Sequence, residues 1–164
     1  MIGGDHLSVA KFFNMTDAVW RRHANPLSVW TRVPIFPLLL ITIWARVWIG
    51  WYCVIPATLL LLWTWLNPRF FGEPQNFESW VSRAVLGEKV WTERKDKPIA
   101  DHHEQIINLL MIPQFAGLFV SIYGIIVLDA WAAVTGTMIM LLGKFWFLDR
   151  MVWIYQDHLA ANKK

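Results

Sequence analysis

The sequence predicts an all-α polytopic membrane protein with four transmembrane helices and an N-terminal interfacial helix, and three observations indicate this class. Of the 164 residues, 56% are hydrophobic and only 16% are charged, whereas a soluble domain carries about 25% charged residues. Two apolar stretches, 33–66 and 106–148, are long enough to supply membrane-spanning helices. The single cysteine, Cys53, excludes a disulfide framework. We therefore treat residues 1–164 as a single membrane domain and exclude disorder, coiled coil and collagen.

Residues 7–24 are predicted to form the interfacial helix. Their apolar residues recur at helical spacing, against charged residues such as Lys11 and Arg21, which is typical of a helix that lies on a membrane surface. Asn25 and Pro26 end this helix, because the residue before a proline disfavours the α conformation. The stretch lacks the apolar core and cleavage site of a signal peptide, so we expect it to remain in the mature protein.

The first apolar block, 33–66, has Arg46 as its only charged residue. As one helix it would reach about 50 Å at 1.5 Å per residue, and the hydrocarbon core of a bilayer is about 30 Å thick. Gly50 marks a turn near the middle of the block. The sequence therefore predicts two short spans, over about 33–49 and 51–66. Both lie at the lower limit of length, so a hairpin that dips into the bilayer without crossing it is the alternative.

The second apolar block supplies a third and a fourth span, over about 106–128 and 130–148, with Asp129 between them. The third helix is predicted to begin at Asp101, because Glu104 follows three residues later as in a capping box. Small residues four apart on these two spans suit close contact between helices in lipid. They are Gly117 and Ser121 on the third span and Ala132 and Gly136 on the fourth.

With four spans, the N-terminus, a loop over 67–105 and a tail over 149–164 lie on one side of the membrane. All 15 lysines and arginines except Arg46 belong to this side, as do the five histidines, and the positive-inside rule assigns it to the cytoplasm. The sequence thus predicts a multi-pass protein of the bacterial cytoplasmic (inner) membrane with both termini cytoplasmic. Most of the 12 tryptophans lie near span ends, as in aromatic belts. The middle of the spans has no lysine, arginine, histidine, aspartate or glutamate, which argues against a pore.

A divalent metal is the cofactor that the polar residues of this cytoplasmic side suggest, since imidazole nitrogens and carboxylate oxygens are common metal ligands. The candidate ligands are His23, His102, His103, Glu88 and Asp149. The spacing does not require a metal, because no histidines stand four apart and adjacent residues point about 100° apart on a helix. The alternative for His102 and His103 is a solvated start of a helix.

An anionic lipid is the second candidate ligand, because guanidinium groups match phosphate oxygens in pairs. The candidate residues are Asn25, Arg32 and Arg83. Basic residues at this interface also serve as plain orientation signals, which is the alternative. A further group, Lys144, Asp149, Arg150 and Trp153, lies at the inner end of the fourth span. In that group we expect Asp149 to face the protein and pair with an arginine, and we expect Asp157, further along the tail, to be exposed.

Three segments carry a resemblance to a known family. They read HANPLSVWTR at 23–32, LGEKVW at 86–91 and GKFWFLDRMVW at 143–153. With them the chain, over roughly 15–157, resembles an uncharacterised family of small bacterial four-span integral membrane proteins. The resemblance implies a four-span architecture and no mechanism. Each segment combines polar residues with tryptophan, the composition expected of a partly buried polar site.

From these observations we expect a small inner-membrane protein whose polar site, at its cytoplasmic end, binds a metal ion or an anionic lipid-like ligand. The alternative is a non-catalytic accessory or assembly subunit of a larger membrane complex. The expected partners are the lipid bilayer, an anionic lipid and, under the alternative, other membrane proteins, and no nucleic acid is expected. Catalysis stays open at this point, with hydrolysis or oxidation of an amphiphile as the natural class and Glu88 or a histidine as the acid or base.

Overall fold

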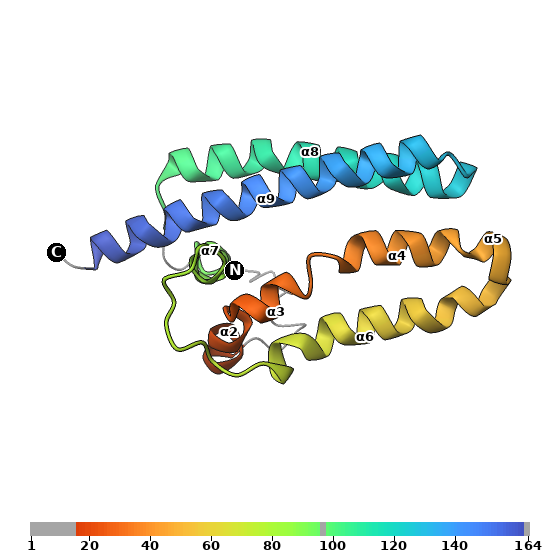
Figure 1. Cartoon of the computed structure of the whole chain (residues 1–164). Helices are drawn as coiled ribbons and strands as arrows, with labels where there is room; N and C mark the ends of the chain where they lie inside the picture. The colour runs from red at the N-terminus through yellow and green to blue at the C-terminus, as the bar shows by residue number, and fades with distance from the viewer. Residues whose placement is uncertain (1–15, 96–97, 163–164) are drawn as a thin grey trace, which may run out of the picture.

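The computed structural model describes residues 16–95 and 98–162, and this part of the chain is helical, with no strand (Figure 1). Its elements are α2 (Asp17–His23), α3 (Pro26–Trp30), α4 (Ile35–Trp44), α5 (Arg46–Ile49), the 3-10 helix η1 (Gly50–Cys53), α6 (Val54–Phe70), α7 (Trp80–Thr92), α8 (Asp101–Val127) and α9 (Ala130–Ala161). The all-α prediction is confirmed. Of the predicted interfacial helix, α2 is described, whereas residues 7–15 lie outside the described residues.

Short polar side chains start several of these helices, because an accepting oxygen just before a helix satisfies a free backbone N–H of its first turn. Asn25 accepts from Leu27 at the start of α3, Ser79 from Ser82 at α7, and Asp129 from Ala132 at α9. α8 begins at Asp101, close to the predicted start, but its capping residue is Ala100 and no side chain caps it.

Among the described residues, three helical stretches are long and apolar enough to cross a membrane, namely Pro26–Phe70, α8 and α9. This finding supports a membrane protein but not the four spans that the sequence predicts. The turn predicted near Gly50 is present, and the φ angle of Gly50 is +55°. The helices on its two sides are short, because α4 has 10 residues and α6 has 17, whereas a 30 Å core needs about 20.

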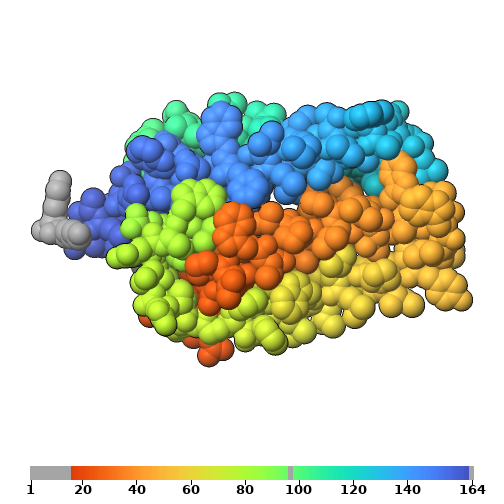
Figure 2. All heavy atoms as spheres, viewed as in Figure 1, coloured from red at the N-terminus to blue at the C-terminus, as the bar shows by residue number. Residues whose placement is uncertain are grey.

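Two pairs of antiparallel helices lie side by side in the structure (Figure 1). α4 and α6 form one pair, joined through α5, and α8 and α9 form the other. Both connections lie at the same end of the molecule, while α2, α3, α7 and the C-terminal part of α9 gather at the opposite end. Figure 2 shows the α3–α4 segment lying against α9 along the visible face. The regions that the sequence assigns to the cytoplasm therefore share one end of the fold.

Glycines bring α8 and α9 into backbone contact. A Cβ added to Gly117 would collide with backbone atoms of Met140 and Gly136, and one added to Gly136 would collide with Ser121. Of the four small residues that the sequence singles out on the two spans, Gly117, Ser121 and Gly136 are buried at this interface. On α9, however, it is Ala133 rather than Ala132 that is buried, and Ala133 faces Gly124.

α7 packs against the α8–α9 pair at the end away from the α8–α9 connection. Gly87 is essential to this contact, because a Cβ there would collide with the backbone carbonyl of Met151. Around it, Ala84 on α7 packs with Ile107 on α8 and with Met151 on α9, and all three are at most 1% exposed. This packing fixes the position of Glu88, the next residue of α7, beside α9.

Candidate functional site

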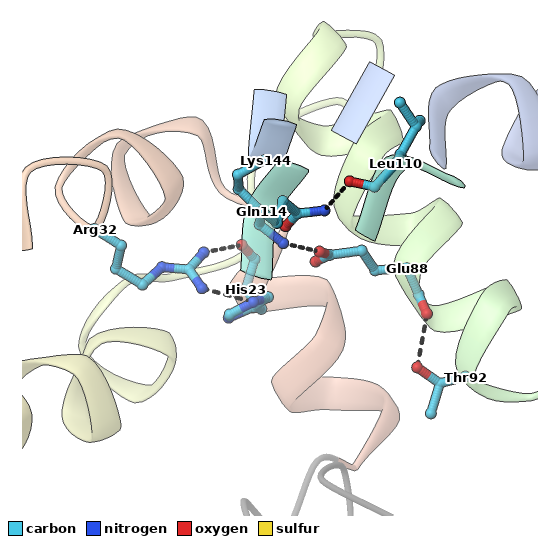
Figure 3. Close-up of polar contacts among 7 residues, drawn as sticks. All are labelled: His23, Arg32, Glu88, Thr92, Leu110, Gln114 and Lys144. Atoms are coloured by element: carbon cyan, nitrogen blue, oxygen red, sulfur yellow. Dashed lines mark hydrogen bonds and ion pairs between the residues drawn. The ribbon is translucent and has the colours of Figure 1, made fainter. Parts of the chain in front are cut away.

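His23 and Arg32 form the first half of a polar cluster at the junction of α2, α7 and α9 (Figure 3). Arg32 follows α3, and its Nη1 lies 2.6 Å from Nε2 of His23, while its Nε donates to the carbonyl of Ser28 at 2.9 Å. Because a guanidinium group only donates, Nε2 of His23 is the acceptor and its Nδ1 carries the hydrogen. This Nδ1 is buried and has no hydrogen-bond partner among the described residues.

The environment of His23 keeps its imidazole neutral. Burial, followed by the charges of Arg32 and Lys144, lowers the pKa of His23 to about 2, because a partly desolvated imidazole beside two cations is disfavoured in its charged form. The ring therefore does not take up a proton near neutral pH. It is also a poor metal ligand here, since Arg32 occupies one nitrogen and would repel a cation.

Glu88 and Lys144 form the second half of the cluster. Nζ of Lys144 lies 2.8 Å from Oε1 of Glu88, and the two side chains are 42% and 21% exposed. Lys144 also lies 4.6 Å from the ring centre of Phe147. Figure 3 shows this pair beside the His23–Arg32 pair, with Gln114 next to Lys144. With His23 neutral, two positive groups and one negative group leave this cluster with an excess of one positive charge.

A groove between α8 and α9 includes Lys144 in its lining. Its volume is about 380 Å³, and it is lined by Met111, Gln114, Phe115, Leu118, Met140, Lys144 and Phe147. Apart from Lys144 and Gln114, every residue of this lining is apolar. Nε2 of Gln114 donates to the carbonyl of Leu110 at 3.3 Å. The groove is therefore amphipathic, with a positive charge at one place and hydrocarbon around the rest.

A second polar group joins the start of α8 to the end of α9. His102, His103 and Asp157 each place a potential ligand atom within 4.8 Å of the others. Nε2 of His103 lies 2.8 Å from Oδ2 of Asp157, and the imidazole rings of His102 and His103 have centres 4.2 Å apart. His103 is only 2% exposed, whereas His102 and Asp157 are exposed.

One protein family matches residues 6–164, which is nearly the whole chain. The chain belongs to the DUF6653 family. This is described as a family of unknown function, so the expected membership of an uncharacterised family is confirmed, while the four spans implied by the resemblance are not. No curated protein and no solved structure gives a significant match.

In this DUF6653 protein the five predicted metal ligands lie in separate places. His23 and Glu88 belong to the first cluster, where each contacts a basic side chain, whereas His102 and His103 lie in a group with Asp157. Asp149 is exposed and accepts a hydrogen bond from Nε1 of Trp80 at 2.9 Å, rather than an arginine. The structure therefore brings together only two of the five, His102 and His103, as a potential metal group.

The three predicted lipid ligands also differ in their surroundings. Arg32 belongs to the first cluster. Asn25 caps α3 and donates through Nδ2 to the carbonyl of Gly72 at 2.9 Å, so its polar atoms are occupied by the fold. Arg83 is half-buried on α7.

Two residues of these groups, Lys144 and Asp157, are missing from the predicted ligand sets. The sequence could have indicated Lys144, because it is the only charged residue of the predicted fourth span. An ionisable residue within a span is a candidate functional residue by default. Asp157 carries none. It stands 54 positions from His103, and only the packing of α8 on α9 brings the two together.

Proposed function

We propose that this DUF6653 protein binds an amphiphile, whose anionic headgroup lies at the cluster of His23, Arg32, Glu88 and Lys144. In this proposal the hydrocarbon chain of the amphiphile lies in the groove between α8 and α9. One observation carries the proposal, because Lys144 belongs both to the polar cluster and to the otherwise apolar groove. Ligand sites of this kind combine apolar walls with a few polar groups that fix the orientation of the ligand.

The charges of the cluster support an anion rather than a cation. The two positive groups outnumber Glu88, and the buried Nδ1–H of His23 is a donor without a partner among the described residues. A phosphate or carboxylate would accept hydrogen bonds from such groups. Because burial and the neighbouring cations lower the pKa of His23 to about 2, this imidazole stays neutral near pH 7 and acts as a hydrogen-bond donor to the anion.

We further propose that both helical pairs cross the cytoplasmic membrane of a bacterium, giving four crossings, and that the cluster faces the cytoplasm. Arg46 is the one lysine or arginine that the sequence does not assign to the cytoplasmic side. It supports this orientation, because it begins α5, at the end of the fold away from the cluster (Figure 1). A reporter fused after Lys164 should therefore signal a cytoplasmic location. A periplasmic signal would contradict the orientation.

Binding is tested with the full-length protein purified in detergent and incubated with phosphatidylglycerol. Native mass spectrometry should show one retained lipid, and much less retention of phosphatidylcholine, whose headgroup has no net charge. Glycerol phosphate, which has the headgroup but no chain, should bind far more weakly if the groove holds the chain. Equal retention of the anionic and the neutral lipid would contradict the proposal.

Two substitutions, each of which removes one positive charge, locate the site. Lys144→Gln should weaken retention of phosphatidylglycerol about tenfold, the order expected for the loss of one charge-assisted hydrogen bond. Lys89→Gln is the matched control, because Lys89 pairs with Asp17 on the surface of the protein. Equal losses in both variants would indicate general attraction to basic residues rather than a site.

Glu88→Gln distinguishes an anion site from a metal site, because the two kinds of site predict different changes in lipid retention and metal content. Glu88 competes with a bound anion for Lys144, so its neutralisation should increase retention of phosphatidylglycerol. If Glu88 were instead a metal ligand, the same change would reduce metal content and leave the lipid unaffected.

The alternative, an accessory or assembly subunit of a larger complex, stays a hypothesis. Such a subunit would pack on partner proteins through helix faces that bear glycine and tryptophan. Gly117, Gly124 and Gly136 are instead used within the chain, between α8 and α9. A subunit should be unstable when purified alone and should co-purify with larger proteins, whereas a lipid-binding protein should be stable alone.

A further inference from the structure

The group formed by His102, His103 and Asp157 is separate from the proposed lipid site. It lies where the first turn of α8 meets the last turns of α9, and it contains no residue of the first cluster. Its three side chains come from two helices whose relative position is fixed by backbone contacts further along. The group is therefore preorganised by the fold rather than assembled from one flexible segment.

The residue types of this group select a class of ion. Two imidazole nitrogens and one carboxylate oxygen suit divalent transition ions such as Zn²⁺, whereas Mg²⁺ and Ca²⁺ prefer sites built from oxygen ligands. Three protein ligands leave at least one coordination position for water. Asp101 and Glu104 in the same first turn of α8 add negative charge, which offsets the positive end of the helix dipole.

His103 is the buried member of this group. Its imidazole is 2% exposed, and its Nδ1 has no hydrogen-bond partner among the described residues. Because Nδ1 has no partner in the described part of the chain, it is free to carry the ring hydrogen while Nε2, which faces Asp157, binds an ion. Burial also holds this ring in place, so that only the exposed side chains of His102 and Asp157 need to move when an ion binds.

We propose that His102, His103 and Asp157 bind one transition-metal ion of the Zn²⁺ type, which fastens the start of α8 to the end of α9. Ligands at about 2.0–2.1 Å from a tetrahedral zinc are about 3.4 Å apart, and the ligand atoms here lie within 4.8 Å of one another. Rotation of the two exposed side chains closes this difference. The ion takes the place of the hydrogen that lies between His103 and Asp157. If the ring is neutral, this hydrogen moves to Nδ1. If the ring is protonated, it is released to the solvent.

The test uses the full-length protein in detergent, purified without a histidine tag and treated with EDTA. Stoichiometric ZnCl₂ should raise the melting temperature, because an ion that binds only the folded state stabilises that state. Native mass spectrometry should show one bound zinc, and MgCl₂ at the same concentration should have no effect. Absence of any zinc-dependent change would overturn the proposal and leave a plain hydrogen bond between His103 and Asp157.

Substitutions of exposed residues identify the site without removing the buried ring. His102→Ala and Asp157→Ala should each weaken zinc binding about tenfold or more, the order expected when a coordination sphere is disturbed. His158→Ala is the matched control, since His158 is the residue after Asp157 and contacts Asn162 instead. Zinc binding that is equal in all three variants and in the unchanged protein would place the ion elsewhere and overturn the proposal.

This proposal does not depend on the proposed lipid site. Lys144→Gln should bind zinc as the unchanged protein does, and His102→Ala should retain phosphatidylglycerol. A loss of both ligands in either variant would show that one site, rather than two, is involved.

Discussion

The two helical pairs are held together in different ways. α8 and α9 meet through Gly117, Gly124 and Gly136, so that their backbones touch over much of their length. The α4–α6 arm has no such glycines, and a Cβ on Gly50, at its turn, would meet only open space. In lipid there is no hydrophobic drive between helices, so close contact and interhelical hydrogen bonds must hold them. Close backbone contact joins α8 to α9, whereas hydrogen bonds tie the α4–α6 arm to the segment before α4 and to α8.

Polar side chains hold the α4–α6 arm at both of its ends. At the end near the cluster, Ser28 donates to Oδ1 of Asn67 at 2.6 Å, and Nδ2 of Asn67 donates to Thr31 at 2.9 Å. At the other end, Arg46 donates to the carbonyl of Ile125, near the end of α8. Between the pairs lies an apolar groove of about 460 Å³, lined from both sides. α8 and α9 are thus joined along their length, whereas polar contacts attach the α4–α6 arm at its two ends.

The largest expected effect lies within the glycine contact. Gly136→Ala should lower the free energy of unfolding by about 3 kcal/mol, because the new methyl group would collide with backbone atoms of Gly117 and Ser121 on α8, which cannot rotate away. Gly72→Ala is the control, since a Cβ there meets nothing within 4 Å. Thermal unfolding of the two variants in detergent measures the difference. Equal melting temperatures would break the distinction between the two pairs.

A smaller effect is expected where hydrogen bonds hold the arm. Asn67→Ala should cost about 2 kcal/mol, because it removes the partner of the buried hydroxyl of Ser28. Thr64→Ala serves as the control on the same helix, since Thr64 bonds only to the carbonyl of Leu60, one turn away. Thermal unfolding again provides the measurement. A silent Asn67→Ala would mean that apolar packing alone holds the arm.

The smallest effect is expected in the pH dependence of stability, and it arises at His23, the last residue of α2. His23 has its pKa lowered in the folded protein, so only the unfolded chain takes up this proton below pH 6.5. Stability should therefore fall as the pH drops below 6.5, by up to about 1.4 kcal/mol per pH unit. Melting temperatures between pH 7.5 and 5.5 should show a flatter curve for His23→Gln and an unchanged one for His158→Gln. Parallel curves for the protein and His23→Gln would refute this assignment.

Asp149 and Asp157 show where sequence reasoning reached its limit. Both are acidic residues in the same C-terminal segment, and the apolar neighbours of Asp149 suggested that it faces the protein, while Asp157 was expected to be exposed. In the structure, Asp149 is exposed and bonds to Trp80, whereas Asp157 contacts the buried His103 despite a side chain that is 62% exposed. Neighbours in sequence therefore did not reveal which helix each carboxylate would meet.

The sequence by itself determined the helical class, the apolar stretches able to enter a membrane, the turn near Gly50 and the small residues between α8 and α9. These properties follow from composition and local spacing, which act within one helix or one turn. Only the tertiary structure decided that Glu88 meets Lys144. It also separated His23 from His102 and His103 and brought Asp157 to the latter pair. Such contacts join residues 50 or more positions apart, and they depend on how helices pack, a property that local spacing does not encode.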